Sequence, residues 1–348
     1  MISAVDIDLV LQNDNIVFHG PEEYASSKLL FGKVILKVRR KFSAKSLKVY
    51  ALGTVFYSFV REVGTNHYVS KDTFHAGKEK LLDHCEVLFD NQHTHTVFAP
   101  GVYEYDFFIK LNGDLPETIN TQYGCTDYIL KASLNKSPLS PKITKQVPIY
   151  IKRISTTDIS QIEPSTDHIQ IEKKFEDKLS VKISTDSKHF SDDQIIKVNV
   201  ELLPINPDLK VETIGTTINE YITIRDPTYS SAKVNYTKLV KTKYKKVFVS
   251  EQEKSETTYM DGTTFSLDVE VPQKYKKVQF DIENDIFQVY HSLNFFCIVE
   301  INNIKERLTL TSPITIVPKE FFTEYFSLPR YTPEHNNSEI LPPPYSEV

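Results

Sequence analysis

The sequence predicts an all-β protein made of two tandem immunoglobulin-like β-sandwich domains and a flexible C-terminal tail. Many short segments carry apolar residues at every second position, which is the period of a half-buried strand. Helical periodicity is weak everywhere, and residues 76–82 form the only short helix candidate. The strand pattern stops over residues 155–176, where large apolar side chains are few, and this predicts a connector between two compact units.

Composition is consistent with this class. The 348 residues can form two ordinary domains, and 40% hydrophobic with 25% charged residues is typical of a soluble globular protein. A net charge of -5 with interspersed signs argues against a nucleic-acid binder. The first residues include Asp6 and Asp8 and lack the pattern of a secretory signal, so we expect a cytoplasmic protein. The cysteines are far apart, which fits a reducing compartment: Cys85, Cys125 and Cys297.

The first predicted domain spans residues 1–154. Alternating segments begin at Val5 and recur along the chain at 33–38, 47–51, 103–111, 128–134 and 147–151. The clearest of them follows a Pro100-Gly101 turn, and its apolar face consists of Tyr103, Tyr105, Phe107, Ile109 and Leu111. These segments predict one sandwich.

The second predicted domain spans residues 177–318, with strands expected near 179–183, 196–202, 265–271 and 308–316. Its longest strand covers 287–301, and a strand of this length is expected to bend or bulge. His291 lies on the apolar face of that strand, which predicts a buried, neutral, hydrogen-bonded imidazole. Residues 319–348 are expected to form a partly packed extension that runs into a flexible tail.

No pattern for catalysis emerges. One stretch is rich in possible metal ligands, namely His67, His75, His84, Cys85, His93 and His95. A metal-dependent enzyme would need these side chains to assemble, but the spacings of a zinc site are absent, and polar loop or edge-strand histidines are the favoured interpretation. The sequence also lacks a nucleophile elbow and phosphate-binding glycine loops. We therefore predict no enzyme, no metal and no cofactor.

A basic run over residues 238–246 places Lys241, Lys243 and Lys245 on one face of a predicted strand. This face could contact an acidic or phosphorylated peptide, or an anionic membrane surface. The alternative, which we favour, is a solvated strand face whose charges discourage pairing with another strand.

The motif Pro342-Pro343-Pro344-Tyr345 is the sharpest local signal in the sequence. Its prolines fix φ and favour a polyproline II helix, and the ring faces with the following tyrosine suit the aromatic grooves of WW domains. The alternative is a tail that is proline-rich without being a binding motif. We predict WW-domain binding by Pro342, Pro343, Pro344 and Tyr345.

Several local patterns, taken in order, resemble the arrestin fold and specifically the alpha-arrestins. In the second half, residues 190–195 are similar to the family's aromatic-x-x-Gly-Glu turn, with Asp193 in place of the glycine. Other segments similar to family strands and turns are Phe98 to Phe107, Leu115-Pro116-Glu117-Thr118, Tyr123 to Ala132, Ile286 to Leu293 and Ser312 to Ile316. The resemblance covers nearly the whole chain.

This resemblance implies a cytosolic adaptor. Its arrestin domains would recognise membrane transporters or receptors as cargo, and its motif at 342–345 would recruit a WW-domain HECT-type E3 ubiquitin ligase, so that cargo is ubiquitylated and sorted for endocytosis. The adaptor would be recruited from the cytoplasm to the plasma membrane or endosomes. A second, weaker WW-binding site is implied at Leu328, Pro329 and Tyr331.

A retromer-type arrestin-fold sorting scaffold is the main alternative. Such a scaffold binds other coat subunits and would not need Pro342, Pro343 or Tyr345. The lysine pair that visual and beta-arrestins carry in their first strand has no match over residues 5–11, so phosphoreceptor sensing of that kind is not implied.

Overall fold

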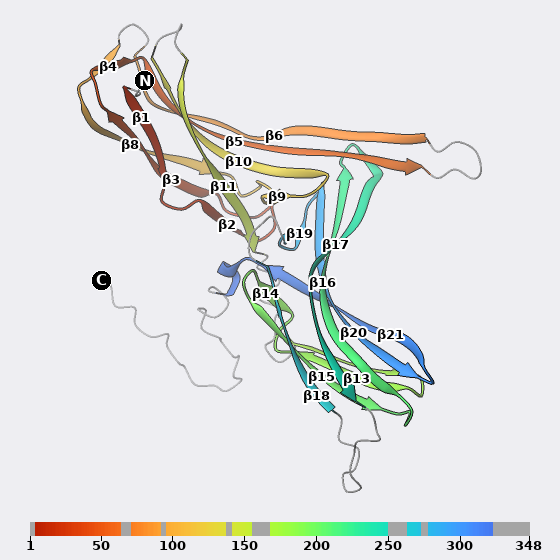
Figure 1. Ribbon diagram of the computed structural model, residues 1–348. Helices are drawn as coiled ribbons and strands as arrows, with labels where there is room; N and C mark the ends of the chain where they lie inside the picture. The colour runs from red at the N-terminus through yellow and green to blue at the C-terminus, as the bar shows by residue number, and fades with distance from the viewer. Residues whose placement is uncertain are drawn as a thin grey trace, which may run out of the picture.

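The computed structural model describes residues 4–63, 71–91, 95–136, 141–154, 168–249, 263–272 and 278–322. Nearly all of this part of the chain is strand or turn, with one helical turn at 319–322, so the all-β prediction is confirmed. No helix in the described ranges is long and apolar enough to cross a membrane. The strands gather into two bodies joined near the middle of the molecule (Figure 1).

The first body contains the strands β1 (Val5–Leu11), β2 (Asn15–His19), β3 (Lys28–Val38), β4 (Phe42–Ala44), β5 (Ser46–Val63), β6 (Lys71–Asp90), β7 (Thr96–Phe98), β8 (Gly101–Leu111), β9 (Ile119–Asn120), β10 (Gly124–Asn135) and β11 (Ile143–Ile154). The sheet β1-β3-β8 faces the larger sheet β2-β11-β10-β5-β6, to which β9 is added. Along β8 the predicted apolar face is confirmed, since Phe107, Ile109 and Leu111 are buried while Phe108 on the other face is exposed. These buried residues join a core drawn from both sheets.

The second body contains the strands β12 (Ile169–Phe175), β13 (Leu179–Thr185), β14 (His189–Ser191), β15 (Ile195–Pro204), β16 (Lys210–Asp226), β17 (Tyr229–Val249), β18 (Thr263–Glu270), β19 (Ile282–Glu283), β20 (Phe287–Ile301) and β21 (Ile304–Val317). The sheet β12-β13-β15-β18 faces the sheet β14-β21-β20-β16-β17, and β19 pairs with β20. Between them lies a separate core of branched and aromatic side chains. Two sandwiches with cores of their own agree with the predicted fold class.

Three local expectations differ from the structure. The helix candidate at 76–82 is wrong, because these residues lie in β6 and pair with β5. The expected bulge belongs to β16 rather than to the long strand: Val211 pairs with Val299 and Thr213 with Ile298, so the extra residue is in β16. Residues 169–175, within the predicted connector, form the strand β12.

Two of the turns in the left-handed backbone region carry aspartate or asparagine. Asp193, where the family pattern has glycine, has φ 70°, so the aspartate adopts the conformation that a glycine would favour. Asn302 and Asn303 join β20 to β21 with φ of 52° and 62°, and their type of two-residue turn matches the twist of paired strands. Short polar side chains thus replace glycine at both turns.

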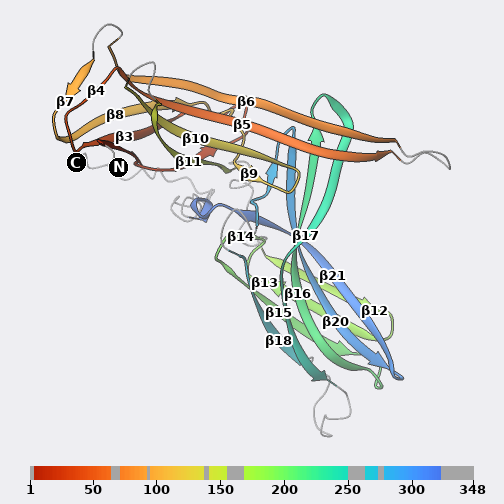
Figure 2. The same cartoon turned by 45° about the horizontal axis from the view of Figure 1, so that its top comes forward.

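The strands β5 and β6 extend beyond the first sandwich as a two-stranded arm. The arm lies beside the turn that joins β16 to β17 in both Figure 1 and Figure 2. A third apolar cluster forms there, and it contains Val55, Tyr57 and Phe59 of β5 together with Ile222, Ile224, Phe287 and Val289 of the second sandwich. The arm therefore shares a small core with the second sandwich.

Candidate functional site

A buried carboxylate ties the arm to the second sandwich. Asp226, the last residue of β16, accepts hydrogen bonds from the hydroxyl of Tyr57 at 3.0 Å and from the backbone N–H of Thr228 at 2.9 Å. Its other oxygen lies 2.9 Å from Nδ1 of His75, whose ring stacks on Phe59. Burial alone would raise the pKa of Asp226, but the contacts with His75, Thr228 and Tyr57 outweigh it and lower that pKa. The carboxylate is therefore a charged acceptor shared by both domains.

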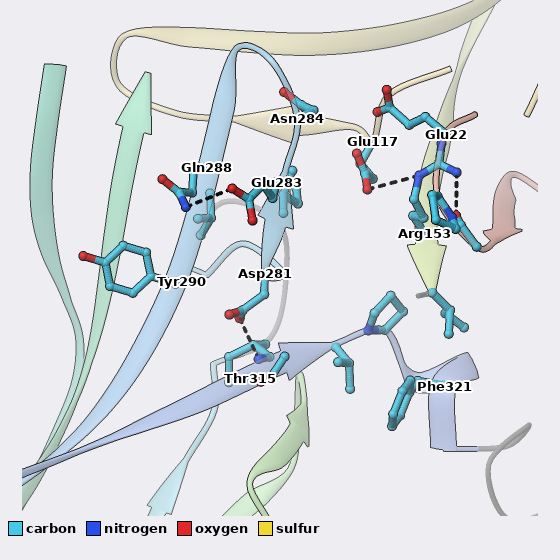
Figure 3. A pocket seen from close by; sticks show the side chains of 18 of the residues that line it. Glu22, Glu117, Arg153, Asp281, Glu283, Asn284, Gln288, Tyr290, Thr315 and Phe321 are labelled. Carbon is cyan, nitrogen blue, oxygen red and sulfur yellow. Dashed lines mark hydrogen bonds and ion pairs between the residues drawn. The ribbon is translucent and has the colours of Figure 1, made fainter. Parts of the chain in front are cut away.

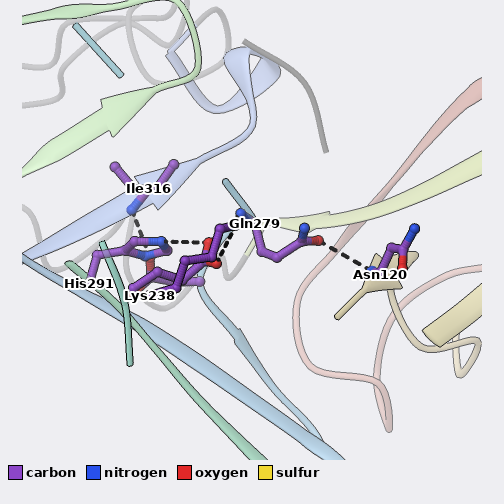
Figure 4. A network of polar contacts seen from close by, with 7 residues as sticks. Asn120, Lys238, Gln279, His291 and Ile316 are labelled. Carbon is purple, nitrogen blue, oxygen red and sulfur yellow. Dashed lines mark hydrogen bonds and ion pairs between the residues drawn. The ribbon is translucent and has the colours of Figure 1, made fainter. Parts of the chain in front are cut away.

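A second polar network surrounds His291 (Figure 4). The imidazole is 1% exposed, with Nδ1 2.6 Å from Asp281 Oδ1 and Nε2 3.3 Å from Glu220 Oε2. Glu220 also accepts from Lys238 Nζ at 3.0 Å and from the backbone N–H of Gln279 at 2.6 Å. Burial opposes protonation, but the two carboxylates outweigh it and raise the pKa of His291 to about 9. The prediction of a buried, hydrogen-bonded His291 is confirmed, but the neutral form is wrong because carboxylates flank both ring nitrogens.

This second network reaches the first domain. The side-chain carbonyl of Gln279 accepts a long hydrogen bond of 3.4 Å from the backbone N–H of Asn120 (Figure 4). Nearby, the hydroxyl of Tyr236 accepts from the backbone N–H of Gln122 at 3.2 Å. Two polar networks and one apolar cluster therefore connect the sandwiches.

A cleft of about 950 Å³ lies where the two domains meet (Figure 3). Its walls come from the turn after β2, the loop before β9, the end of β11, the segment 281–290 and the end of β21. Arg153 of β11 is central to one wall, where its guanidinium donates to the carbonyls of Gly20 at 3.0 Å and of Gly113 and Leu115 at 2.9 Å each. The guanidinium also lies over the ring of Phe18. Arg153 is held in place by backbone groups of the first domain.

Two glutamates lie beside Arg153 (Figure 3). Glu117 is 8% exposed, and its Oε1 is 3.4 Å from Nε of Arg153. Burial raises the pKa of Glu117, and the positive charge of Arg153 offsets this only in part. Burial, followed by repulsion from Glu117, also raises the pKa of Glu22. This wall therefore holds two carboxyl groups against one guanidinium, and burial makes both carboxyl groups harder to ionise.

The predicted WW-binding residues cannot be placed. Pro342, Pro343, Pro344 and Tyr345 lie outside the described residues, as do Leu328, Pro329 and Tyr331. The described chain reaches 322, and Phe321 before it is buried, with its ring stacked on His189. Residues 319–322 thus pack on the second sandwich, in line with the partly packed extension expected after 318.

Lys241, Lys243 and Lys245 are exposed on β17, the last strand of its sheet. Their partners on β16 are Ile218, Thr216 and Ile214, so the three lysines lie on the face of the sheet that is turned toward the core. At the edge of the sandwich, they cover the open side of that core. Lys241 lies 4.0 Å from Glu270 and Lys245 lies over the ring of Phe265, both on the opposite sheet. These contacts favour the interpretation of a solvated face that protects an edge strand.

The histidine-rich stretch is divided by the fold. His75 belongs to the Asp226 network, while on β6 His84 is half-exposed and Cys85 is exposed. His67 and His93 lie outside the described residues. Among the residues that the structure describes, no group of at least three His, Cys, Asp or Glu side chains is placed to hold a metal ion.

One face of the arm is apolar and exposed. Phe74 of β6 pairs with Val60 of β5, and these side chains are 67% and 51% exposed. Phe56, on the same face, is 43% exposed. The opposite face carries Tyr57 and the other residues that contact the second sandwich.

Sequence patterns did not reveal the junction. Arg153, Glu117 and Asp226 come together from segments that are remote in the sequence, and each has an ordinary local context. The only available signal was the Leu115-Pro116-Glu117-Thr118 turn, which marked the loop but not the partner of its glutamate. Tertiary contacts alone identify Arg153 and Glu117 as part of the cleft and Asp226 as part of the link between the arm and the second sandwich.

The geometry defines a class: tandem all-β sandwiches that share a polar junction. Two family models match the chain, the arrestin (or S-antigen) N-terminal domain over residues 15–159 and the arrestin (or S-antigen) C-terminal domain over residues 176–321. The chain belongs to the arrestin family, and its relatives place it among the alpha-arrestins. Neither model describes a catalytic domain.

Three curated relatives that the chain matches are fungal proteins. An arrestin domain-containing protein of Schizosaccharomyces pombe is 24% identical, and the match covers 92% of this chain and 52% of the relative. A probable HECT-type ubiquitin ligase-interacting protein creD of Neosartorya fischeri is 24% identical, with 98% and 58% covered. The HECT-type ubiquitin ligase-interacting protein creD of Emericella nidulans is 26% identical, with 83% and 48% covered. The chain spans about half the length of these relatives.

Proposed function

We propose that this protein is a non-catalytic adaptor for ubiquitin-dependent sorting of membrane proteins. Its arrestin domains recognise a transporter or receptor, and Pro342, Pro343, Pro344 and Tyr345 bind a WW domain of a HECT-type E3 ubiquitin ligase. Cargo held beside the ligase is ubiquitylated and enters endocytic sorting. The protein acts from the cytoplasm and is recruited to the plasma membrane or endosomes, which imaging of a fluorescent fusion before and after cargo stimulation tests.

One observation carries the proposal, namely a Pro-Pro-x-Tyr motif in a chain with two arrestin domains. Relatives named for interaction with a HECT-type ubiquitin ligase support this choice of partner. The physical logic is one of proximity, because a chain that binds cargo and ligase at separate sites raises the effective concentration of one near the other. A second contact at Leu328, Pro329 and Tyr331 adds avidity if one partner spans both sites.

The deciding measurement is binding of purified tandem WW domains to the full chain. Replacing Tyr345 with alanine removes the aromatic anchor, so we expect at least about tenfold weaker binding, the scale of a binding hot spot. Tyr331→Ala has a smaller effect alone and adds to the loss in the double variant. Isothermal titration calorimetry with wild type, both single variants and the double variant separates these contributions.

Tyr244→Ala is the matched control, because Tyr244 is an exposed tyrosine on β17 outside both motifs. Its binding should equal that of wild type. Equal binding by wild type and the double variant, or no binding by wild type, would rule out the ligase-recruiting mechanism.

A retromer-type scaffold remains the alternative function. It predicts association with other coat subunits that does not depend on Tyr345. Affinity purification of wild type and Tyr345→Ala from the same cells distinguishes the two, since an adaptor loses its ligase in the variant and a scaffold keeps its partners.

A further inference from the structure

The cleft at the domain junction contains three buried polar atoms that complete no hydrogen bond, namely Oε1 of Glu22, Oε2 of Glu117 and Nδ2 of Asn284. Nε of Arg153 is a fourth buried polar atom, and its only partner is Oε1 of Glu117 in a long ion pair of 3.4 Å. All four residues line the same cleft (Figure 3). Buried polar atoms are nearly always paired, and an unpaired one costs about 1–3 kcal/mol, so a cluster of three indicates a place for a polar ligand.

The available acceptors are carboxylate oxygens. Glu117 is 8% exposed, and its Oε1 is paired with Arg153 while its Oε2 is not paired. Glu22 adds a second buried oxygen. The remaining acidic residues of the lining are Glu23, Asp281, Glu283 and Asp285. Arg153 is the only arginine or lysine among the lining residues, and backbone carbonyls occupy both of its terminal nitrogens.

This arrangement selects against an anion, since carboxylates would repel it. A metal ion is disfavoured as well, because the described residues contain no cluster of three or more ligands placed for one. A guanidinium or ammonium group fits, because its several N–H donors can satisfy Glu22 Oε1 and Glu117 Oε2 together while its charge offsets theirs.

The unpaired donor favours a peptide as the source of that cation. Asn284 accepts from the backbone N–H groups of Ile286 at 3.1 Å and Phe287 at 2.8 Å through Oδ1, which fixes the amide. Its Nδ2 faces Glu117 closely enough to lower the pKa of that carboxyl group, but this contact falls short of a full hydrogen bond. A polypeptide offers backbone carbonyls to such a donor in addition to a basic side chain, whereas a free diamine or polyamine offers no acceptor once it is fully protonated.

We propose that the cleft between the two domains binds a lysine or arginine side chain of a partner polypeptide. The inference rests on the proposed adaptor function for the identity of that partner, which is the cytoplasmic segment of a membrane cargo. Such segments are enriched in lysine and arginine next to the membrane. Glu22 and Glu117 bind the cation, and Asn284 binds the adjoining backbone.

The test measures fluorescence anisotropy of a labelled Gly/Ser peptide with three arginines and of matched peptides with lysine or glutamine instead. The arginine and lysine peptides should bind the full chain, and the glutamine peptide should not. Glu22→Gln and Glu117→Gln keep side-chain shape but remove charge, and each should weaken binding about tenfold, the scale of one charge-assisted hydrogen bond. Equal binding of all three peptides, or unchanged binding by both variants, would overturn the proposal.

A third variant changes binding in the opposite direction. Asn284→Asp keeps an oxygen for the N–H groups of Ile286 and Phe287 and places another carboxylate oxygen in the cleft, so the arginine peptide should bind at least about threefold more tightly. A role for these residues in folding alone predicts no such gain. This variant keeps the proposal testable if Glu117→Gln fails to fold.

Glu172→Gln is the matched control, because Glu172 is exposed on β12 away from the cleft, and its binding should equal that of wild type. Spermidine is the competitor that identifies the source of the cation. The peptide site would be overturned if spermidine bound as tightly as the peptide and if Asn284→Asp changed both affinities equally. WW-domain binding by the same variants should be unchanged, so failure of this site and failure of ligase recruitment are distinguishable.

Discussion

At the scale of single residues, His291 shows how neighbours decide the chemistry of a side chain. It lies on the apolar face of β20 among buried aliphatic residues, yet Asp281 and Glu220 approach the two nitrogens of its ring. The carboxylates in turn are satisfied by other donors, since Asp281 accepts from the backbone N–H of Ile316 and Glu220 from Gln279. A buried charge is tolerated because every neighbour of opposite sign is also hydrogen-bonded.

We expect the stability of the protein to fall in alkaline solution because of His291. Its pKa is raised from 6.5 to about 9, so the unfolded chain releases the proton first, and the stabilisation is fully present below pH 6.5 and lost as the pH rises through about 9. The shift corresponds to roughly 3 kcal/mol. Thermal unfolding of wild type and His291→Gln from pH 6 to 10 checks this, with the variant less stable at pH 6 and missing this alkaline loss.

His84→Gln is the control for that series, since His84 is a half-exposed histidine on β6. It should follow the wild-type pH profile. Parallel profiles for wild type and His291→Gln would contradict a protonated His291.

Glu220 affects stability at acid pH. Its pKa in the folded protein is lowered from the ordinary value of 4.5, so its contribution to stability is present above pH 4.5 and is lost as the pH falls through the lowered pKa.

At the scale of elements, β17 is an edge strand that must avoid pairing with other chains. Its exposed lysines cover the open side of the second sandwich, where Lys241 approaches Glu270 and Lys245 approaches Phe265. Lysines along an edge are a common protection against association, because pairing would bury their charges. The position of the basic run is therefore explained by the sheet to which it belongs.

We expect the triple variant Lys241→Gln, Lys243→Gln and Lys245→Gln to self-associate more readily, because the edge loses its charge. Light scattering against protein concentration measures this. Binding to anionic liposomes and to an acidic peptide should change less than about twofold, the effect of losing exposed charges that make no specific contact.

The control for the triple variant removes as many charges from central strands, namely Lys33→Gln, Lys37→Gln and Lys131→Gln on β3 and β10. It should stay as monodisperse as wild type. A large loss of liposome or peptide binding that is specific to the β17 variant would instead support the acidic-partner contact.

At the scale of the whole molecule, the arm of the first sandwich packs against the second sandwich and so connects the two domains. The shared apolar cluster and the Asp226 network lie at one side of the junction, and the His291 network and the cleft lie along it. Lys152 of β11 adds an ion pair of 3.0 Å with Glu320, beyond the last strand of the second domain. A ligand in the cleft would contact residues from both domains.

Replacing Asp226 with alanine should loosen this junction. The change removes the acceptor shared by Tyr57, His75 and Thr228, and leaving buried donors unpaired costs about 2 kcal/mol or more. Hydrogen–deuterium exchange should rise in the arm and at the β16–β17 turn, while the central strands of each sandwich stay protected.

Asp268→Ala on β18 is the matched control, since this aspartate is exposed on the sheet away from the junction. Its exchange pattern should match that of wild type. Equal exchange in the arm for Asp226→Ala and wild type would show that the Asp226 contacts do not hold the domains together.

Local sequence pattern determined the all-β class, the strand faces and the likeness to alpha-arrestins. Alternation placed Phe107, Ile109 and Leu111 in a core because burial of a strand face depends on neighbours two residues apart. The same reasoning delimited the strand at 287–301 as the structure has it, but the prediction that this strand is the longest is wrong, because β16 and β17 of the same domain are longer. The Pro-Pro-x-Tyr prediction also comes from sequence alone, because a short extended motif needs no fold to be recognised.

Tertiary structure alone decided the rest. The charge of His291, the partners of Asp226 and the unpaired atoms around Arg153 depend on segments that are remote from one another in the sequence. Periodicity shows which face of a strand is buried, but it carries no information about which distant strand or loop will face it. Electrostatics depends on those distances, so the cleft and its preference for a cation became visible only once both domains were in place.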